Sequence, residues 1–201
     1  MQLIHQHHGT FRTFVIFLAT SWSIKKLKVI FTTTGFERVS VSGSVDFYFA
    51  YGSNMNSRRV RKRQMSFEEA LAGKLKGYRL AFNKLSIKYP GAGAANVVLD
   101  RDGKTEGVIY RLTEPDEIQM MDPFEGYPQH YRREVLPVDT SLGKIYAWVY
   151  IANTAYVAEG LRPARWYLDH LLAGRQYLSR GYFDALSQTV CLQDSDYEPV
   201  I

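Results

Sequence analysis

The chain has 201 residues, of which 46% are hydrophobic and 22% charged, and a formal net charge of +5. This composition is that of a globular protein long enough to bury one sizeable core. A single cysteine, Cys191, excludes an internal disulfide framework and a metal site built from cysteines. We interpret Cys191 as a small apolar residue, because no base lies beside it in the sequence to make it a nucleophile.

Residues 1–45 differ from the rest of the chain in their charge. They contain one acidic residue, Glu37, against five lysines and arginines. Their apolar segment, residues 14–22, is shorter than the roughly 20 residues that a membrane-spanning helix needs. A signal peptide, a transit peptide and a poorly ordered extension remain as alternatives, but no small-residue cleavage pattern follows the apolar segment. We expect a poorly ordered extension over residues 1–45 and a cytoplasmic protein without membrane association.

From residue 46 onward, strand-like segments alternate with turn residues. The predicted strands are residues 47–51, 75–83, 95–99, 105–112, 130–138 and 144–152. A loop is predicted at residues 86–94, and a turn around Asp102 and Gly103 separates two of the strands. Helices are predicted in the arginine-rich stretch through Gln64, from Thr113 to a stop at Pro123, and in residues 162–178 and 181–192.

These elements predict an α+β domain over residues 46–190, followed by a tail over residues 191–201. Most connections between the strands are short and hairpin-like, and the helices are gathered after them. The sheet is therefore expected to be mixed or antiparallel and to curl into a small barrel.

The segment Tyr51-Gly52-Ser53-Asn54 follows the first predicted strand directly. Glycine lets the backbone turn sharply, and the serine and asparagine side chains add hydrogen-bond donors to the backbone N–H groups. A basic helix is predicted just behind, and its N-terminus would add positive potential. Such a turn is suited to a carboxylate or a phosphate. The alternative is a plain β-turn, in which these residue types are common.

A second candidate is Glu125, which lies in a predicted turn among prolines, a glycine and two aromatic residues. A lone carboxylate in apolar surroundings has a raised pKa and is suited to transferring protons. The alternative is a solvated loop glutamate. No second carboxylate lies at a telling spacing, so a hydrolase with paired acids is not favoured.

Two other patterns point to nucleic-acid or dinucleotide binding, and neither is convincing. The basic run of residues 58–64 has no aromatic platform and no known reader motif beside it, so we interpret it as a solvated helix face. The glycines of residues 91–96 lack the strand–turn–helix context of a dinucleotide-binding loop. His130 and His170 are interpreted as structural histidines.

Seven segments, taken in order, resemble the γ-glutamylcyclotransferase family over residues 47–186. Their sequences are YFAYGSNM (48–55), LKGYRLAFNK (75–84), GAGAANVV (91–98), EGVIYRL (106–112), MDPFEGYPQHY (121–131), YAWVYIA (146–152) and LRPARWYLDHLLAG (161–174). The resemblance implies a small mixed β-barrel flanked by helices. The first 45 residues have no counterpart in that family that we recognise.

The resemblance also implies a reaction and its site. The family closes γ-glutamyl amino acids or peptides to 5-oxoproline and releases an amino acid or an amine, with no metal or other cofactor. Glu125 would be the general acid and base, and the loop that holds the substrate would be Tyr51, Gly52, Ser53, Asn54, Met55 and Asn56. We expect Tyr131, Tyr150 and the loop of residues 91–96 to form the walls beyond the scissile bond.

The partner implied is a small γ-glutamyl compound, with no nucleic acid and no membrane, and the chain is expected to be a monomer or a homodimer. The identity of the leaving amine stays open. The alternative function is a non-catalytic module on the same barrel that binds a ligand, or binds nucleic acid through the basic run of residues 58–64.

Overall fold

The computed structural model describes the backbone of strands within residues 7–40 and all of residues 44–86 and 89–192. The chain forms two compact units, residues 1–44 and residues 45–201. The first unit is a sheet of four antiparallel strands in the order β1-β2-β3-β4: β1 is His7–His8, β2 is Phe11–Thr20, β3 is Ser23–Phe31 and β4 is Arg38–Ser40. The poorly ordered extension expected over residues 1–45 stays a prediction. Strands are described within it, and β2 is rich in the β-branched and aromatic residues that favour strands.

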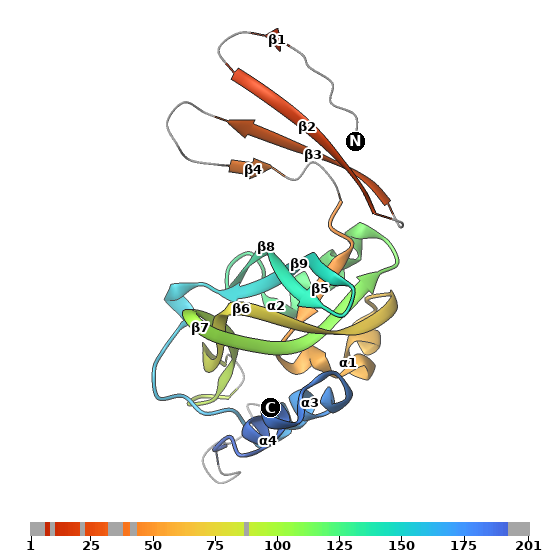
Figure 1. The fold of residues 1–201 in the computed structure, drawn as a ribbon. Coiled ribbons are helices and arrows are strands. Elements are labelled where there is room, and N and C mark those ends of the chain that lie inside the picture. The colour runs from red at the N-terminus through yellow and green to blue at the C-terminus, as the bar shows by residue number, and fades with distance from the viewer. Residues whose placement is uncertain are drawn as a thin grey trace. The chain divides into compact units, whose positions relative to one another are not determined.

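The second unit is built on a closed barrel of five strands in the order β5-β7-β6-β8-β9 (Figure 1). The strands are β5 (Phe47–Ala50), β6 (Phe67–Leu85), β7 (Gly93–Leu112), β8 (Tyr131–Thr140) and β9 (Gly143–Ala152). All neighbours are antiparallel except β5 and β9, which pair in parallel at Tyr48 and Trp148. The predicted α+β fold with a small mixed barrel is therefore confirmed.

The turn predicted at Asp102 and Gly103 does not reverse the chain, so the prediction of two separate strands here is wrong. Strand β7 runs continuously through it, and both halves pair with β6. The register moves from Lys76 opposite Lys104 to Tyr78 opposite Leu99, so residues 100–103 form a bulge. The turn-forming residues are therefore the extra residues of a bulge in β7. Such a bulge bends the strand and increases its twist.

Short helices connect the strands and cover the barrel. They are η1 (Ser53–Met55), α1 (Ser57–Lys62), η2 (Pro115–Met120), α2 (Asp122–Glu125), η3 (Thr154–Tyr156), α3 (Arg165–Leu172), η4 (Arg175–Tyr177) and α4 (Arg180–Ser187). The predicted stop at Pro123 is also wrong. Pro123 lies in the first turn of α2, where its missing N–H has no intrahelical partner to lose. No helix within the described residues is long and apolar enough to cross a membrane.

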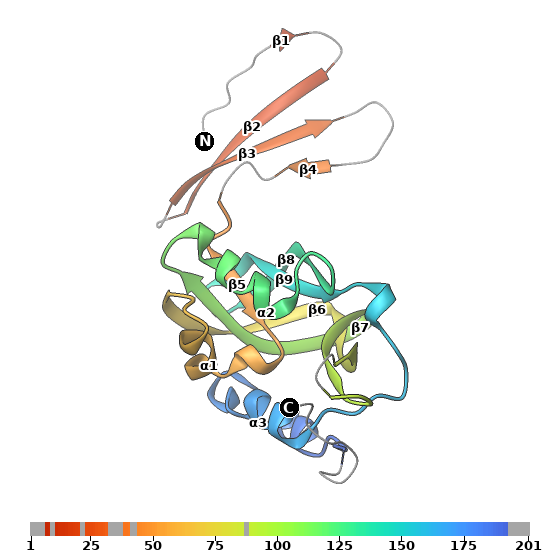
Figure 2. The same cartoon turned by 180° about the vertical axis from the view of Figure 1, so that it is seen from behind.

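The alternation of side chains along β5 divides the core into two clusters. Phe49 and Tyr51 join a cluster built from strand residues, which fills the interior of the barrel. Tyr48 and Ala50 point the opposite way, into a cluster with the helices. This second cluster includes Leu168 of α3 and Leu186 of α4, and both of these helices lie on the same side of the barrel (Figures 1 and 2). Of the predicted tail, Leu192 donates from its N–H to the Pro163 carbonyl (3.0 Å), and residues 193–201 lie outside the described residues.

We expect a protein shortened to residues 45–201 to keep the thermal stability and the ligand binding of the full chain. All five strands of the barrel and every helix that the structure describes lie in this unit. The measurements are the unfolding midpoint and the activity of both proteins at equal concentration. A fall of the midpoint by more than about 5 °C, equivalent to roughly 1–2 kcal/mol for a domain of this size, would show that residues 1–44 stabilise the barrel unit.

Candidate active site

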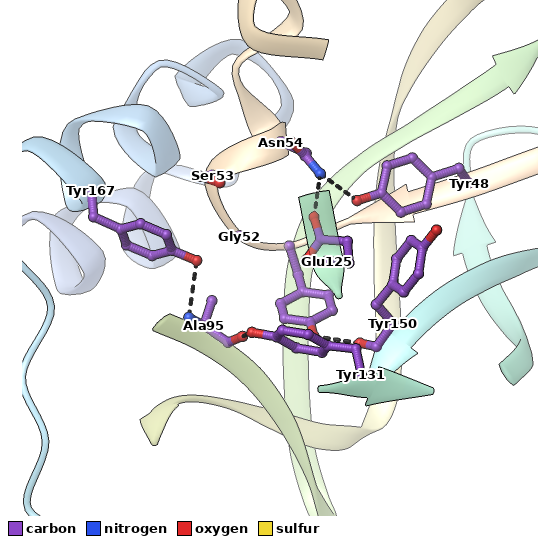
Figure 3. Close-up of a pocket in the computed structure, with 10 residues that line it drawn as sticks. Tyr48, Gly52, Ser53, Asn54, Ala95, Glu125, Tyr131, Tyr150 and Tyr167 are labelled. Atoms are coloured by element: carbon purple, nitrogen blue, oxygen red, sulfur yellow. Dashed lines mark hydrogen bonds between the residues drawn. The ribbon is translucent and has the colours of Figure 1, made fainter. Parts of the chain in front are cut away.

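A small pocket opens where β5 ends, and it is bordered by α2 and α3 (Figure 3). Seven of the nine residues predicted for the site line it: Tyr51, Gly52, Ser53, Asn54, Glu125, Tyr131 and Tyr150. Ala95, from the loop of residues 91–96 expected at the substrate walls, also lines it, and so do two residues that the sequence does not predict for the site, Tyr48 and Tyr167. Residues separated by more than 100 positions in the sequence thus meet around one cavity.

The turn after β5 is a single turn of 3-10 helix that leads into α1. The N–H groups of Met55 and Asn56 donate to the carbonyls of Gly52 (2.9 Å) and Ser53 (3.3 Å). Gly52 has φ −111°, which any residue can adopt, so the expected need for conformational freedom is not the reason for a glycine. The reason is space, because a Cβ at Gly52 would lie 3.1 Å from both the Ala95 Cβ and the Tyr167 hydroxyl oxygen. The glycine allows the turn to pack directly against the pocket wall.

Met55 and Asn56, also predicted for the substrate loop, do not line the pocket. The Met55 side chain is buried in the core between the barrel and α3. Asn56 caps the N-terminus of α1, where its side chain accepts a hydrogen bond from the Arg58 N–H (3.1 Å). Both residues therefore hold the turn in place.

The amide of Asn54 is occupied by protein groups, and so it does not face the pocket as a free donor. Its Nδ2 donates to the Tyr48 hydroxyl (2.8 Å) and to Glu125 Oε1 (2.9 Å). Its Oδ1 accepts from Arg63 Nη1 (3.0 Å). Asn54 thus links the turn after β5 to the carboxylate on α2 (Figure 3).

Glu125 is the last residue of α2, one helical turn that ends at Gly126 in the left-handed conformation (φ 63°). Its side chain is only 17% exposed, so Glu125 is not the solvated loop residue of the alternative interpretation. Burial raises the pKa of Glu125 above the ordinary carboxyl value, while the charge of Arg63 and the hydrogen bonds from Asn54 and Arg63 oppose that rise. Two of these hydrogen bonds end on Oε1, and Oε2 has no partner among the described residues.

Arg63 belongs to the basic run of residues 58–64 that was interpreted as a solvated helix face. Arg58, Arg61 and Lys62 are indeed exposed. The Arg63 side chain, in contrast, is only 12% exposed and pairs with Glu125 across 3.2 Å, with its guanidinium over the Phe124 ring. The sequence contains a signal for this: Arg63 follows the apolar Val60 by three positions, which places both on one side of the helix.

Five tyrosines surround the carboxylate, and three of them donate their hydroxyl protons to the protein. Tyr51 donates to the backbone carbonyl of Tyr150, Tyr131 to that of Ala95 (2.7 Å), and Tyr150 to Asp122 Oδ1 (2.6 Å). The hydroxyls of Tyr131 and Tyr150 are therefore not free to orient a substrate. The fourth, Tyr48, accepts a hydrogen bond from Asn54.

Three hydroxyl groups that line the pocket have no acceptor for their protons among the described residues. Tyr48 accepts from Asn54, and the fifth tyrosine, Tyr167, accepts from the Ala95 N–H (3.0 Å), so the proton of each remains available. The third is the Ser53 hydroxyl, on a residue that is itself buried. The pocket thus offers three hydroxyl donors and one carboxylate oxygen to a ligand. A site of this kind suits a molecule with a carbonyl or carboxylate and a proton to transfer.

Tyr48 and Tyr167 cannot be recognised as site residues from the sequence, because aromatic residues in strands and helices usually mark core packing. Ala95 belongs to the glycine-rich segment 91–96, which was placed at the substrate walls, and this residue does line the pocket. In the part of the chain that the structure describes, no group of three or more His, Cys, Asp or Glu side chains could hold a metal ion.

Three solved structures share this fold. A protein described as a gamma-glutamyl cyclotransferase is 20% identical, with a TM-score of 0.63 over 73% of this chain and 89% of its own. YkqA from Bacillus subtilis is 22% identical, with a TM-score of 0.65 over 90% of this chain and 70% of its own. An uncharacterized protein from Homo sapiens is 21% identical, with a TM-score of 0.64 over 75% of this chain and 91% of its own.

At these identities the structural likeness shows the fold, and the sequence itself shows the family. No curated protein matches the chain significantly. The family model described as gamma-glutamyl cyclotransferase, AIG2-like, matches residues 48–168, which include the turn, Glu125 and all five tyrosines of the pocket. The chain therefore belongs to the AIG2-like gamma-glutamyl cyclotransferase family.

Proposed function

We propose that this protein is a γ-glutamylcyclotransferase, which converts a γ-glutamyl amino acid or peptide into 5-oxoproline and a free amine. The observation that carries the proposal is the position of Glu125. This largely buried carboxylate has one unpaired oxygen and shares a pocket with hydroxyls whose protons have no acceptor, among them those of Ser53 and Tyr167. Family membership supports the same reaction.

The glutamyl half of the substrate carries an α-carboxylate, an α-ammonium group and the γ-amide to be cleaved. The N–H groups of Met55 and Asn56 already close the turn, so the carboxylate would bind the hydroxyls of Ser53 and Tyr167. Held in this way, the glutamyl chain folds so that its nitrogen faces its own γ-carbonyl carbon. Closure of the five-membered ring is intramolecular, and a well-held geometry of this kind contributes on the order of 7–11 kcal/mol.

Glu125 would carry the proton from one nitrogen to the other. Its free Oε2 takes a proton from the α-ammonium group, and the amine then forms a bond to the γ-carbonyl carbon. When the original C–N bond breaks, the same carboxyl group gives this proton to the leaving nitrogen. The second proton that the attacking nitrogen loses passes through the same carboxylate to the released amine, which leaves as an ammonium ion. Burial raises the pKa of Glu125 toward the pH at which it must work, which suits a group that acts first as base and then as acid.

The proposal is tested by incubating the protein with γ-glutamyl-alanine, without added cofactors, and measuring 5-oxoproline. Formation of 5-oxoproline and alanine in equal amounts is the expected result. The opposite result, no 5-oxoproline from several γ-glutamyl compounds together with salt-sensitive retention of DNA, would favour a binding module instead.

A further inference from the structure

Lys84, near the end of β6, is a buried cation outside the set of residues that line the pocket. It pairs with Ala94 of β7, bridges to Val157, and is only 6% exposed. Its ammonium group has no hydrogen bond and no ion pair with any described residue. Lys74, Lys76, Lys104 and Lys144 all lie within 4.0 Å of a carboxylate. A buried lysine without an anionic partner is unusual, because charged groups in protein interiors are normally paired.

One contact places this ammonium group beside the pocket, and two electrostatic effects agree with that position. It lies 5.6 Å from the centre of the Tyr131 ring, and Tyr131 lines the pocket. Burial lowers the pKa of His130, and the positive charge of Lys84 lowers it further. His130 packs against Gly126, the residue that follows Glu125. Burial lowers the pKa of Lys84 itself, and the charge of Glu125 opposes this, although the two groups form no ion pair.

The contact with Tyr131 does not satisfy the ammonium group. A lysine over an aromatic ring gains a modest attraction, but its three N–H donors still need acceptors. The nearby amides are already engaged with each other, because Asn96 Nδ2 donates to Asn83 Oδ1 (3.1 Å) and Asn96 Oδ1 accepts from the Ala152 N–H (2.9 Å). The surrounding residues therefore fix the position of the Lys84 ammonium group and leave its N–H donors available for a ligand.

We propose that Lys84 binds a carboxylate on the leaving group, so that the preferred substrates are γ-glutamyl amino acids and peptides whose leaving amine carries a carboxylate near the scissile bond. The inference rests on the proposed function. In the proposed function, the hydroxyls of Ser53 and Tyr167 bind the carboxylate of the glutamyl half. The hydroxyls of Tyr131 and Tyr150 donate to protein acceptors, so they are not available to bind the leaving group. Lys84 is then the donor beside Tyr131 that remains for the other half of the substrate.

The test compares two substrates that differ only in this carboxylate, γ-glutamyl-alanine and γ-glutamyl-alaninamide. For the wild-type protein we expect kcat/KM to be about ten- to a hundredfold higher for γ-glutamyl-alanine, the range of a hydrogen bond to a charged group. Lys84→Met should remove most of this preference by lowering kcat/KM for γ-glutamyl-alanine alone, and Lys84→Arg should retain part of it. Lys76→Met, on the same strand but paired with Asp139, is the matched control for the loss of one positive charge.

Equal kcat/KM for the two substrates with the wild-type protein would overturn the inference, even if Lys84→Met failed to fold. An equal loss on both substrates in Lys84→Met would do the same, because it would indicate a structural role or a contact with the glutamyl half. Binding of both compounds to Glu125→Gln, measured by calorimetry, separates the two proposals. If Glu125→Gln prefers the carboxylate compound but the wild-type protein forms no 5-oxoproline, the Lys84 site is supported and the reaction is contradicted. Equal binding of the two compounds would contradict the site.

Discussion

Glu125→Gln is expected to lower kcat for 5-oxoproline formation by at least a hundredfold, within the range of about 10²–10⁴ that general acid–base catalysis contributes. Glutamine keeps the size of the side chain and can still accept the hydrogen bonds from Asn54 and Arg63 on its amide oxygen. It cannot take a proton from the α-ammonium group. Substrate affinity should therefore change much less than kcat.

The measurement is steady-state release of 5-oxoproline, with substrate binding followed separately by calorimetry. Glu114→Gln, which changes an exposed glutamate ahead of η2, is the matched control and should behave as the wild type does. If Glu125→Gln kept more than about a tenth of the wild-type kcat while remaining folded, the proton transfers would have to be assigned to another group.

Arg63→Gln should destabilise the protein and change the pH dependence of its activity. The substitution leaves the buried Glu125 carboxylate with Asn54 as its main partner, and breaking a buried ion pair from one side costs on the order of 3 kcal/mol of the free energy of unfolding. Because the charge of Arg63 lowers the pKa of Glu125, its removal raises that pKa further. The acid limb of the kcat/KM profile should therefore move to higher pH, and activity at neutral pH should fall.

The sign of the stability change with pH follows from the same shift. In Arg63→Gln, the folded protein would hold the Glu125 proton to a higher pH than the unfolded chain, whose glutamates titrate near about 4.3. Between these two pKa values the folded state binds more protons, so the free energy of unfolding falls as the pH rises through that window. The deficit relative to the wild type should thus be small near pH 4 and larger near pH 7.

Denaturant unfolding at these two pH values and a pH–rate profile together test the role of Arg63. Arg58→Gln removes a charge from an exposed position of the same helix and should change neither measurement. Arg63→Lys should retain part of the stability and part of the pH profile, because it keeps the charge. An unchanged acid limb in Arg63→Gln would mean that the ion pair does not influence the group that titrates during turnover.

The sequence alone determined the barrel class, three of its strands and the segments that carry the site, because these depend on local signals. Of β6 and β7 it predicted only parts. Apolar residues at strand spacing predicted β5, β8 and β9 to within a residue or two at most ends. Glycine, serine and asparagine after β5 predicted a turn, and the apolar surroundings of Glu125 predicted a carboxylate with a raised pKa. Each of these inferences needed only neighbours within a few positions along the chain.

Tertiary structure alone decided which polar groups form hydrogen bonds within the protein and which remain available for a ligand. Asn54, predicted as a substrate donor, is used to hold Glu125, and the hydroxyls of Tyr131 and Tyr150 bond to the protein. Arg63 and Lys84 carry the same charge as their exposed neighbours in the sequence. Only long-range packing places Arg63 against the Glu125 carboxylate and buries Lys84 without a carboxylate partner. Hydrogen-bond partners at sequence separations of 28 to 71 residues decide the roles of Asn54, Arg63 and the two tyrosines, and no local pattern encodes such distances.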